Sequence, residues 1–377
     1  MCLKVVTPIN IADGIVLGAK DYLYDSRRQK VFFLNLHQWH MFIYKHMLLE
    51  KYESYLANFR DKQSLLEWLR MQGYDIDDVR TVITSEALAT VNLMDSERKK
   101  TLNDINRHIQ QPDGSLYVPG SSIKGVFRTA ILYSLLQKRQ DIKVKYWRQI
   151  QEKISSNYFK PYRDFNKLIS DLENELLHTL RLLDGNIRSN NAVCSAMRGL
   201  QVSDTYASRN MQTAILQKVD GGFDKFGKAS PKKLPIFREC MLPKAELFFD
   251  VKVEKAVMNT IGINSVDDLL KATHSFFAAV TDLLQQAFGK EYQEAFQGVA
   301  AGNMFLGGNT GFLSKTLLAM LAPDKDTAKN TIKVLLDKSF KNHKHLLRDK
   351  VIAPRTLKCT NYNGKLMLMG VAEVRKV

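Results

Sequence analysis

The chain has 377 residues, of which 45% are hydrophobic and 25% charged. This composition excludes a disordered protein, and the length is sufficient for two domains. The 55 Lys and Arg outnumber the 39 Asp and Glu and give a formal net charge of +16. Because such an excess repels itself in the folded state, it predicts a polyanionic partner. Nucleic acid is favoured over an anionic membrane surface, and simple solubility is the alternative.

The cysteines Cys2, Cys194, Cys240 and Cys359 are too scattered for a zinc or redox motif. No stretch has the features of a signal peptide or the length of an apolar membrane span. We therefore expect a soluble, cytoplasmic protein with reduced cysteines and with no cofactor, metal or membrane partner.

The first half of the chain predicts short strands and long helices. The expected strands are 3–6, which ends at Thr7-Pro8 as an edge strand or at a strand terminus, 31–36 and 115–118. The expected helices are 38–71, with Gly73 as its C-cap, and 123–138, whose apolar residues recur at helical spacing. The pattern of residues 77–109 is mixed and assigns them to no element.

The second half continues the mixture. A helix is expected over 165–183, stopping at 184–186, and a second helix begins at a capping box formed by Ser265 and Asp268 and ends near 288. The expected strands are 199–204, 245–253 and 366–374. Residues 219–235 are rich in Gly, Lys, Pro and Ser, which predicts a linker or a mobile loop.

Strands and helices mix without the strict alternation of a doubly wound sheet, which favours an α+β fold. The change of composition near 219–238 places a domain boundary there and divides the chain into 1–230 and 231–377. The helical blocks near 38–71 and 140–195 are expected to be insertions.

Residues 118–128, here named the Pro-Gly-Ser-Ser loop, have the composition of a phosphate-binding loop. A turn of small residues leads into a predicted helix whose first N–H groups and dipole attract an anion. Lys124 and Arg128 are four residues apart and share one face near the helix start. These features predict contact with a phosphate, and an ordinary capped helix with solvated cations is the alternative.

Residues 305–316, here named the glycine loop, are similar to a Walker A loop at first sight. That motif requires Gly-Lys-Ser/Thr in immediate sequence, but three residues separate Gly311 from Lys315. The loop therefore does not predict nucleotide hydrolysis. Its N–H groups could still lie against a phosphate or a 2′-OH, and a flexible turn is the alternative.

Basic and aromatic residues interleave at 143–148, 158–163 and 223–228. Such residues can stack bases and hold phosphates, although aromatics at helical spacing more commonly pack in a core. The basic run 338–350 is expected to be a solvated helix face, and His343 and His345 lack a nearby acidic ligand. If the chain cut RNA, His108 is the residue that we would expect to deprotonate a 2′-OH.

The stretch 119–128 closely resembles the Pro-Gly-Ser-Ser-aliphatic-Lys-Gly-x-x-Arg signature of the RAMP superfamily of CRISPR proteins. Residues 3–14 resemble the opening strand and Thr-Pro-x-x-Ile turn of that family, and 201–204 resemble its Val-Ser-Asp element. The glycine loop is similar to the Gly-x-x-x-Gly-Phe-Leu-Ser-Lys-Thr loop of the fifth-subunit family of type III-A (Csm) interference complexes.

This resemblance implies two ferredoxin-like (RRM-like) domains with helical insertions. It also implies a non-catalytic, single-copy subunit that binds the guide RNA (crRNA), caps the 3′-end side of the complex and assists crRNA maturation in antiviral defence. The implied partners are crRNA, the backbone RAMP subunit, a small helical Csm subunit and host nucleases. Carried over residue by residue, the RNA contacts fall on Ser121, Ser122, Lys124, Gly125, Arg128, Gly307, Gly308, Asn309, Thr310, Gly311 and Lys315.

Two alternatives stay open. One is a metal-independent endoribonuclease of the same superfamily that cuts CRISPR repeats. The other is a generic basic adaptor that binds duplex DNA.

Overall fold

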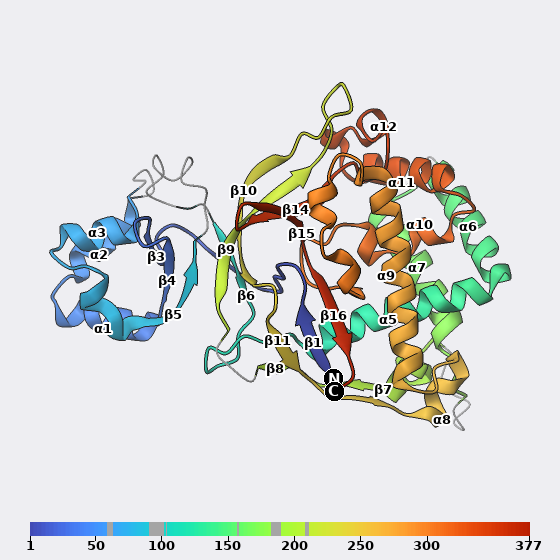
Figure 1. Cartoon of the computed structure of the whole chain (residues 1–377), viewed down its shortest axis with the longest axis horizontal. Helices are drawn as coiled ribbons and strands as arrows, with labels where there is room; N and C mark the ends of the chain where they lie inside the picture. The colour runs from blue at the N-terminus through green and yellow to red at the C-terminus, as the bar shows by residue number, and fades with distance from the viewer. Residues whose placement is uncertain (59–62, 90–101, 103, 157, 182–189, 208–210) are drawn as a thin grey trace.

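The computed structural model describes residues 1–58, 63–89, 102, 104–156, 158–181, 190–207 and 211–377. Helices and strands mix within these residues, so the expected α+β class is confirmed. Figure 1 shows a long sheet in the middle of the molecule, with a small group of helices on one side and a larger group on the other.

The two ends of the chain meet in a five-stranded sheet. Its strands, in spatial order, are β13 (Met304–Phe305), β16 (Val371–Arg375), β1 (Cys2–Val5), β11 (Glu246–Phe248) and β8 (Tyr206–Ala207). Cys2 lies opposite Arg375, and the termini are side by side in Figure 1. The expected first strand is therefore confirmed. It is a central strand, and Thr7-Pro8 marks its end and not a sheet edge.

The second sheet runs through most of the molecule. Its main path is β2 (Ala12–Leu17), β6 (Ile105–His108), β10 (Lys232–Met241), β9 (Thr213–Gly221), β5 (Ile83–Leu88), β4 (Lys30–Leu34) and β3 (Tyr22–Asp25). The strand β14 (Leu357–Tyr362) pairs with β9 and with β15 (Lys365–Leu368). A third sheet pairs β7 (Leu200–Val202) with β12 (Val251–Val253).

Of the two expectations for 219–235, the linker is wrong, because these residues form the end of β9, the loop of the hairpin and the start of the antiparallel β10. Gly, Lys and Ser crowd the tip of the hairpin and dominate its composition. Pro235 lies inside β10 between Lys233 and Phe237, where the register shifts and a missing N–H costs no ladder bond. Strands from both 1–230 and 231–377 share the two larger sheets, and the division at 230 stays a prediction.

The helical block that follows β4 is built from short pieces, not from one helix. These are α1 (Leu36–Lys45), α2 (Leu49–Ala57), α3 (Leu65–Met71) and the 3₁₀ helix η1 (Ile76–Val82). Met47 ends α1 in a left-handed turn, with φ of 55°, and Ser64 caps α3 in a capping box with Glu67. Gly73 has φ of 87°, as expected for a residue just past a helix end.

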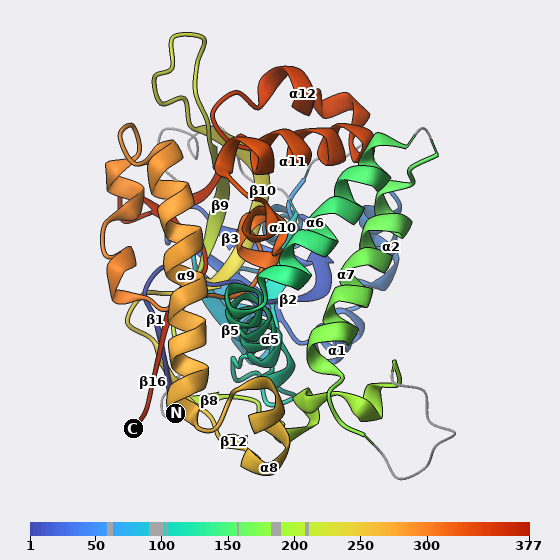
Figure 2. The ribbon, with the colours of Figure 1, turned by 90° about the vertical axis from the view of Figure 1, so that its right-hand side faces the viewer.

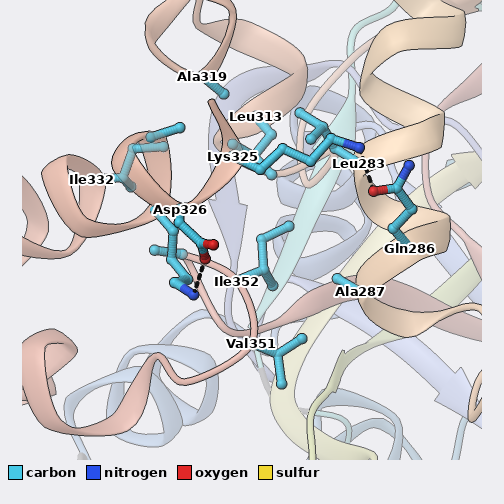
Figure 3. Close-up of a pocket in the computed structure, with 13 residues that line it drawn as sticks. Leu283, Gln286, Ala287, Leu313, Ala319, Lys325, Asp326, Ile332, Val351 and Ile352 are labelled. Atoms are coloured by element: carbon cyan, nitrogen blue, oxygen red, sulfur yellow. Dashed lines mark hydrogen bonds and ion pairs between the residues drawn. The ribbon is translucent and has the colours of Figure 1, made fainter. Parts of the chain in front are cut away.

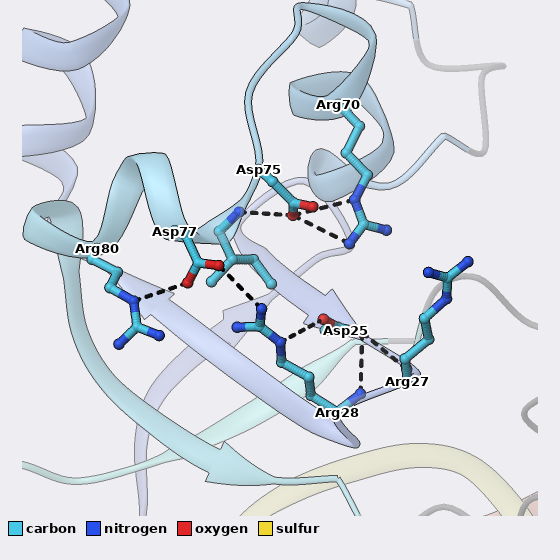
Figure 4. A network of polar contacts seen from close by, with 8 residues as sticks. Asp25, Arg27, Arg28, Arg70, Asp75, Asp77 and Arg80 are labelled. Carbon is cyan, nitrogen blue, oxygen red and sulfur yellow. Dashed lines mark hydrogen bonds and ion pairs between the residues drawn. The ribbon is translucent and has the colours of Figure 1, made fainter.

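Ion pairs cross the outer surface of this block (Figure 4). Asp77 pairs with Arg28 at 3.2 Å and with Arg80 at 2.9 Å, and Arg70 reaches Asp75 at 3.2 Å. These side chains are exposed, so water and salt screen the pairs and each contributes little to stability. Asp25 is buried and accepts the backbone N–H groups that follow it, which fixes the turn between β3 and β4.

The larger group of helices covers the opposite side. It contains α5 (Gly120–Lys138), α6 (Gln140–Ser155), α7 (Pro161–Leu177), α8 (Lys255–Met258), α9 (Val266–Phe288), α10 (Leu318–Leu321), α11 (Lys325–Ser339) and α12 (His345–Arg348). Helices α6 and α7 lie side by side (Figure 2). Short 3₁₀ helices are η2 (Ala192–Cys194), η3 (Ala196–Gly199), η4 (Asn259–Ile261), η5 (Gln293–Phe296), η6 (Val299–Ala301), η7 (Leu313–Lys315) and η8 (Lys341–His343).

Most of the other expected elements are present with shifted ends. Helix α5 begins three residues before the expected 123–138, and α7 occupies most of the expected 165–183, whose predicted stop at 184–186 lies outside the described residues. Ser265 accepts the N–H of Asp268 and starts α9, as predicted. The expected strand 245–253 is divided between β11 and β12, and 366–374 is divided at Gly370. Residues 115–118 contribute an isolated bridge and not a strand.

Candidate nucleic-acid interface

The start of α5 is held by a close contact within the chain. A Cβ atom on Gly120 would lie 2.4 Å from the carbonyl oxygen of Val202, so only glycine fits there. The backbone N–H of Gly120 donates to Asp204 Oδ1 at 2.7 Å, and that of Val118 donates to Thr205 Oγ1 at 2.7 Å. The Val-Ser-Asp element therefore places one carboxylate at the helix N-terminus, where a phosphate from outside would otherwise find the first N–H group.

The other residues of the Pro-Gly-Ser-Ser loop face outward to different degrees. Ser121 and Gly125 are exposed, and Ser122 and Lys124 are half-buried. Burial lowers the pKa of the Lys124 ammonium, since atoms around it displace water. Arg128 is exposed and forms an ion pair with Glu173 of α7. The structure thus brings Lys124 and Arg128 to one side of α5, but it shows Arg128 engaged with a carboxylate.

The glycine loop is fastened to the segment that follows β1. Gly307 has φ of 87°, and a Cβ atom there would lie 2.4 Å from the carbonyl oxygen of Asn10. The N–H of Gly308 donates to the same oxygen at 2.7 Å. Position 307 therefore requires glycine, whereas Gly308 contributes only its backbone N–H, and both residues hold the loop in the fold.

The C-terminal half of the glycine loop is held from inside. The side chain of Thr310 is buried. The hydroxyl of Ser314 lies within 3.1 Å of three acceptors, which are the hydroxyl and carbonyl oxygens of Thr310 and the carbonyl oxygen of Gly311. A Cβ atom on Gly370 would lie 2.2 Å from the Thr310 methyl carbon, so the turn between β15 and β16 closes over this residue. Thr310 therefore packs inside the fold, and its contact with RNA stays a prediction.

Asn309 and Lys315 are the polar members of the glycine loop whose side chains make no hydrogen bond or ion pair with the residues that the structure describes. Asn309 has φ of 61°, and its Nδ2 atom is buried with no hydrogen-bond partner in the described chain. Lys315 is exposed. The pKa of its ammonium is lowered mainly because neighbouring atoms displace water, and to a lesser extent because the positive charge of Arg238 repels it. Gly311 has φ of 94°, and a Cβ atom there would lie 3.5 Å from Cγ of Lys358.

His108 lies at the end of β6 and is completely buried. Its Nδ1 accepts the backbone N–H of Ile11 at 2.9 Å, and its Nε2 lies 3.2 Å from the carbonyl oxygen of Tyr117. A carbonyl only accepts, so Nε2 carries the proton and the ring is neutral. Burial lowers the pKa of His108 to about 4. The ring has no free nitrogen for a substrate, which contradicts its suggested role as a base in RNA cleavage.

The three basic and aromatic clusters differ in the structure. Tyr146 of the first cluster is buried in the core, and Phe159 of the second packs against the core. The third cluster occupies the tip of the β9–β10 hairpin, where Phe226 is 76% exposed and the Lys225 ammonium lies 4.8 Å from its ring centre. Tyr158 of the second cluster is 89% exposed as well, so both the second cluster and the hairpin tip present an open aromatic side chain beside cations.

A separate apolar pocket lies between α9, α10 and α11 (Figure 3). Leu283, Ala287, Leu313, Ile332 and Ile352 line it, and Lys325 and Asp326 stand at its rim. This lining brings no nucleophile and base together. Within the described residues, no group of three or more His, Cys, Asp and Glu is placed to hold a metal ion. His345 instead bonds buried Asp349 at 2.7 Å, which also pairs with Arg355.

Sequence reasoning missed two residues that position the loops. Asn10 fastens the glycine loop, and Asp204 caps α5, although both belong to motifs that the sequence singled out. An Asn shortly after a strand and an Asp in a short polar segment give no signal of their distant partners. No described helix has the length and hydropathy that crossing a membrane requires.

Comparison with known proteins agrees with this architecture. The RAMP superfamily model matches residues 2–311. The chain belongs to the RAMP superfamily. A relative from Mycobacterium tuberculosis (strain ATCC 25618 / H37Rv), described as the CRISPR system Cms protein Csm5, is 26% identical to this RAMP chain. The match covers 99% of this chain and 96% of the relative.

Two solved structures share the fold of this RAMP protein. One is a chain in a cryo-EM structure of a Csm–crRNA–target RNA ternary complex of a type III-A CRISPR–Cas system, with a TM-score of 0.67 and 19% identity over 99% of both chains. The other is the crystal structure of T. onnurineus Csm5, with a TM-score of 0.60 and 19% identity over 99% of this chain and 100% of that one. The resemblance to the fifth Csm subunit is thereby confirmed.

Proposed function

We propose that the chain is an RNA-binding, non-catalytic subunit of a type III-A Csm effector complex in CRISPR defence. The observation that carries this proposal is the match along nearly the whole chain to proteins described as Csm5 and to a chain of a Csm–crRNA–target RNA complex. The formal charge of +16 supports a polyanionic partner.

The proposed ligand is the guide RNA, held by its backbone. A subunit that serves guides of many sequences has to read phosphates and 2′-OH groups, not base edges. Ser121, Lys124 and Lys315 are accessible for such contacts, and Gly125 allows an RNA backbone to approach α5 closely. Arg128 would join them by exchanging Glu173 for a phosphate.

The remaining parts of the proposal concern the assembly. The subunit would cap the 3′-end side of the complex in the cytoplasm, contact the backbone RAMP subunit and a small helical Csm subunit, and assist crRNA maturation by positioning host nucleases. The finer fold assignment, two ferredoxin-like domains with helical insertions, belongs to the same proposal. The two larger sheets and the helical blocks at α1–α3 and α6–α7 support it.

Binding and cleavage can be tested on the same samples. The purified chain is incubated with end-labelled single-stranded RNA in EDTA across a salt series, and each sample is run on a native and a denaturing gel. A salt-sensitive shift with intact RNA is expected, and Lys124→Ala should weaken it equally for RNAs of different sequence. A loss that depends on the bases, or a preference for duplex DNA of equal length, would contradict the proposal.

The denaturing gel also tests the alternative of a metal-independent endoribonuclease. Discrete cleavage to a 2′,3′-cyclic phosphate product would establish that activity. The buried, fully bonded ring of His108 argues against this residue as its base.

A further inference from the structure

Cations from three strands and from the glycine loop lie on one face of the large sheet. Along β9 the side chains of residues 216, 218 and 220 share a face, because strand residues alternate. Arg238 of β10 lies opposite Leu216, and Lys358 of β14 lies opposite Asp220. Lys218, Arg238 and Lys358 therefore belong to the same face.

The glycine loop lies against this face. A Cβ atom on Gly311 would lie 3.5 Å from Cγ of Lys358, so the loop backbone passes beside the stem of that lysine, and the φ of 94° favours glycine at this position. Lys315 follows at the end of the loop and is close enough to Arg238 for the two charges to repel. The loop thus adds a fourth cation to the three from the strands.

These charges are only partly compensated within the chain. Asp220 pairs with Lys358 at 2.9 Å and with Lys218 at 3.7 Å. Arg238 and Lys315 have no ion pair in the part of the chain that the structure describes. Four cations and one carboxylate leave an excess of three positive charges in a half-buried place. Their mutual repulsion destabilises the folded chain unless an anion binds among them.

In the described chain, strand β10 and the glycine loop each carry a donor without an acceptor. Arg238 Nη1 and Asn309 Nδ2 are both buried and have no hydrogen-bond partner among the described residues. A buried donor without an acceptor costs free energy on the order of 1–3 kcal/mol, more for a charged group. An oxygen-rich anion supplies acceptors for both kinds of group, whereas a neutral ligand would leave the charge excess in place.

We infer that Arg238 and Lys315, with Lys218, Lys358 and Asn309 around them, form a binding site for one phosphodiester of an RNA backbone. This inference rests on the proposed function and adds a site on the sheet to the two loops. The strand cations escaped sequence reasoning because Lys218, Arg238 and Lys358 are far apart in the chain and adjoin no common motif. Free inorganic phosphate has the same chemistry and is separated from RNA by the test.

The test uses the full chain and four substitutions. Lys315→Gln and Arg238→Gln, singly and combined, remove charge at the site. Lys51→Gln removes the same charge from an exposed lysine on α2, and Lys124→Ala serves as the variant of the Pro-Gly-Ser-Ser loop. The affinity for a single-stranded RNA oligonucleotide is measured by fluorescence anisotropy across a salt series, and circular dichroism checks folding. Because Lys315 is exposed, we expect Lys315→Gln to fold, and this variant tests the site even if Arg238→Gln does not fold.

Each single substitution at the site should weaken RNA binding roughly tenfold, the effect of losing one charge-assisted hydrogen bond. It should also reduce the slope of log K against log salt by about 0.7, the value for one phosphate on a single strand. Because both cations hold one phosphate, the double variant should lose no more slope than either single variant. Lys51→Gln should match the unsubstituted chain.

Several results would overturn the inference. If Lys124→Ala weakens binding while the sheet variants do not, the site is wrong and the proposed function stands. If the unsubstituted chain binds no RNA, the proposed function fails as well. A slope loss in the double variant that is the sum of the single losses would mean two separate phosphates. Thermal stabilisation by millimolar inorganic phosphate that Arg238→Gln abolishes, with RNA affinity unchanged, would assign the site to the free anion.

Discussion

The backbone N–H of Ile11 donates a hydrogen bond of 2.9 Å to Nδ1 of His108. On its other side, His108 donates to the carbonyl oxygen of Tyr117, directly before the Pro-Gly-Ser-Ser loop. Asn10, the neighbour of Ile11, holds the glycine loop through its own carbonyl oxygen. One buried imidazole thus links the supports of the two loops, which come from segments that are almost 200 residues apart.

This link predicts a pH dependence of stability. The folded chain keeps His108 neutral with a pKa of about 4, whereas an unfolded histidine has a pKa near 6.5. Below 6.5 the unfolded state therefore binds the proton that the folded state refuses, and stability falls as the pH decreases towards 4. The full loss is on the order of 3 kcal/mol. Urea unfolding at a series of pH values measures it.

The comparison variants isolate the contribution of His108. Glu239, which is buried and bonds the N–H of His108, has a raised pKa and acts in the opposite direction. The difference in the free energy of unfolding between the unsubstituted chain and His108→Gln removes the contribution of Glu239. This difference should shrink as the pH falls from 6.5 to 4. His40→Gln, at an exposed histidine, serves as the control for replacing a histidine by glutamine. A difference that stays constant over this range would contradict the buried neutral imidazole.

Two glycines of the Pro-Gly-Ser-Ser loop should respond oppositely to alanine. Gly120→Ala places a Cβ atom against the backbone of Val202 and should lower the free energy of unfolding by about 2–3 kcal/mol. Gly125 has open space around it within α5, so Gly125→Ala should raise the free energy of unfolding by about 0.5–1 kcal/mol through helix propensity. Chemical denaturation of both variants gives the values.

The Gly125→Ala variant also distinguishes an effect on stability from an effect on RNA binding. If RNA approaches α5 at Gly125, then Gly125→Ala should weaken RNA binding while it stabilises the chain. Gain of stability without any change in affinity would remove Gly125 from the proposed interface.

The glycine loop offers a second matched pair. Gly307→Ala combines a left-handed φ with a Cβ atom 2.4 Å from the carbonyl oxygen of Asn10, and it should cost about 2–4 kcal/mol of stability. The adjacent Gly308→Ala meets the same oxygen at 3.7 Å, an ordinary contact, and should change stability by less than about 0.5 kcal/mol. Thermal or urea unfolding distinguishes them, and equal effects would show that the Asn10 contact does not fix this loop.

The sequence predicts where the two loops lie better than it predicts what each of their glycines contacts. Runs of Gly, Ser and Pro mark places where the backbone turns or approaches something closely. The nearest neighbour of Gly120 is Val202, and that of Gly307 is Asn10, so part of each signature is explained by packing inside the chain. Local composition cannot distinguish a glycine that faces RNA from one that faces its own backbone.

The errors in the fold predicted from the sequence have a similar cause. The helical pattern of 38–71 continues through the turn at Met47, because both helices present apolar residues to the same core. The β9–β10 hairpin has the composition of a linker or loop because its tip carries the turn residues and the alternation of its strands is interrupted at Pro235. The strands that pair with β1 lie more than a hundred residues away, as does β9, one of the two partners of β14, and short-range patterns carry no information about these pairings.

The ion pair between Arg128 and Glu173 predicts that one substitution will improve RNA binding. Glu173→Gln removes a negative charge and leaves Arg128 free to bind a phosphate. We expect the affinity for single-stranded RNA to rise about two- to fivefold at low salt, with the salt slope steeper by up to about 0.7. Loss of this partly exposed pair should cost less than about 1 kcal/mol of stability.

Glu175→Gln is the matched control, because it removes the same charge from the same helix. Glu175 pairs with Lys145 and bonds Tyr146 on α6, away from Arg128. Fluorescence anisotropy across a salt series should show tighter binding for Glu173→Gln only. Equal gains in both variants would indicate a general electrostatic effect of α7. No gain in either would mean that Arg128 does not reach the RNA, since a freed guanidinium beside a phosphate would strengthen binding.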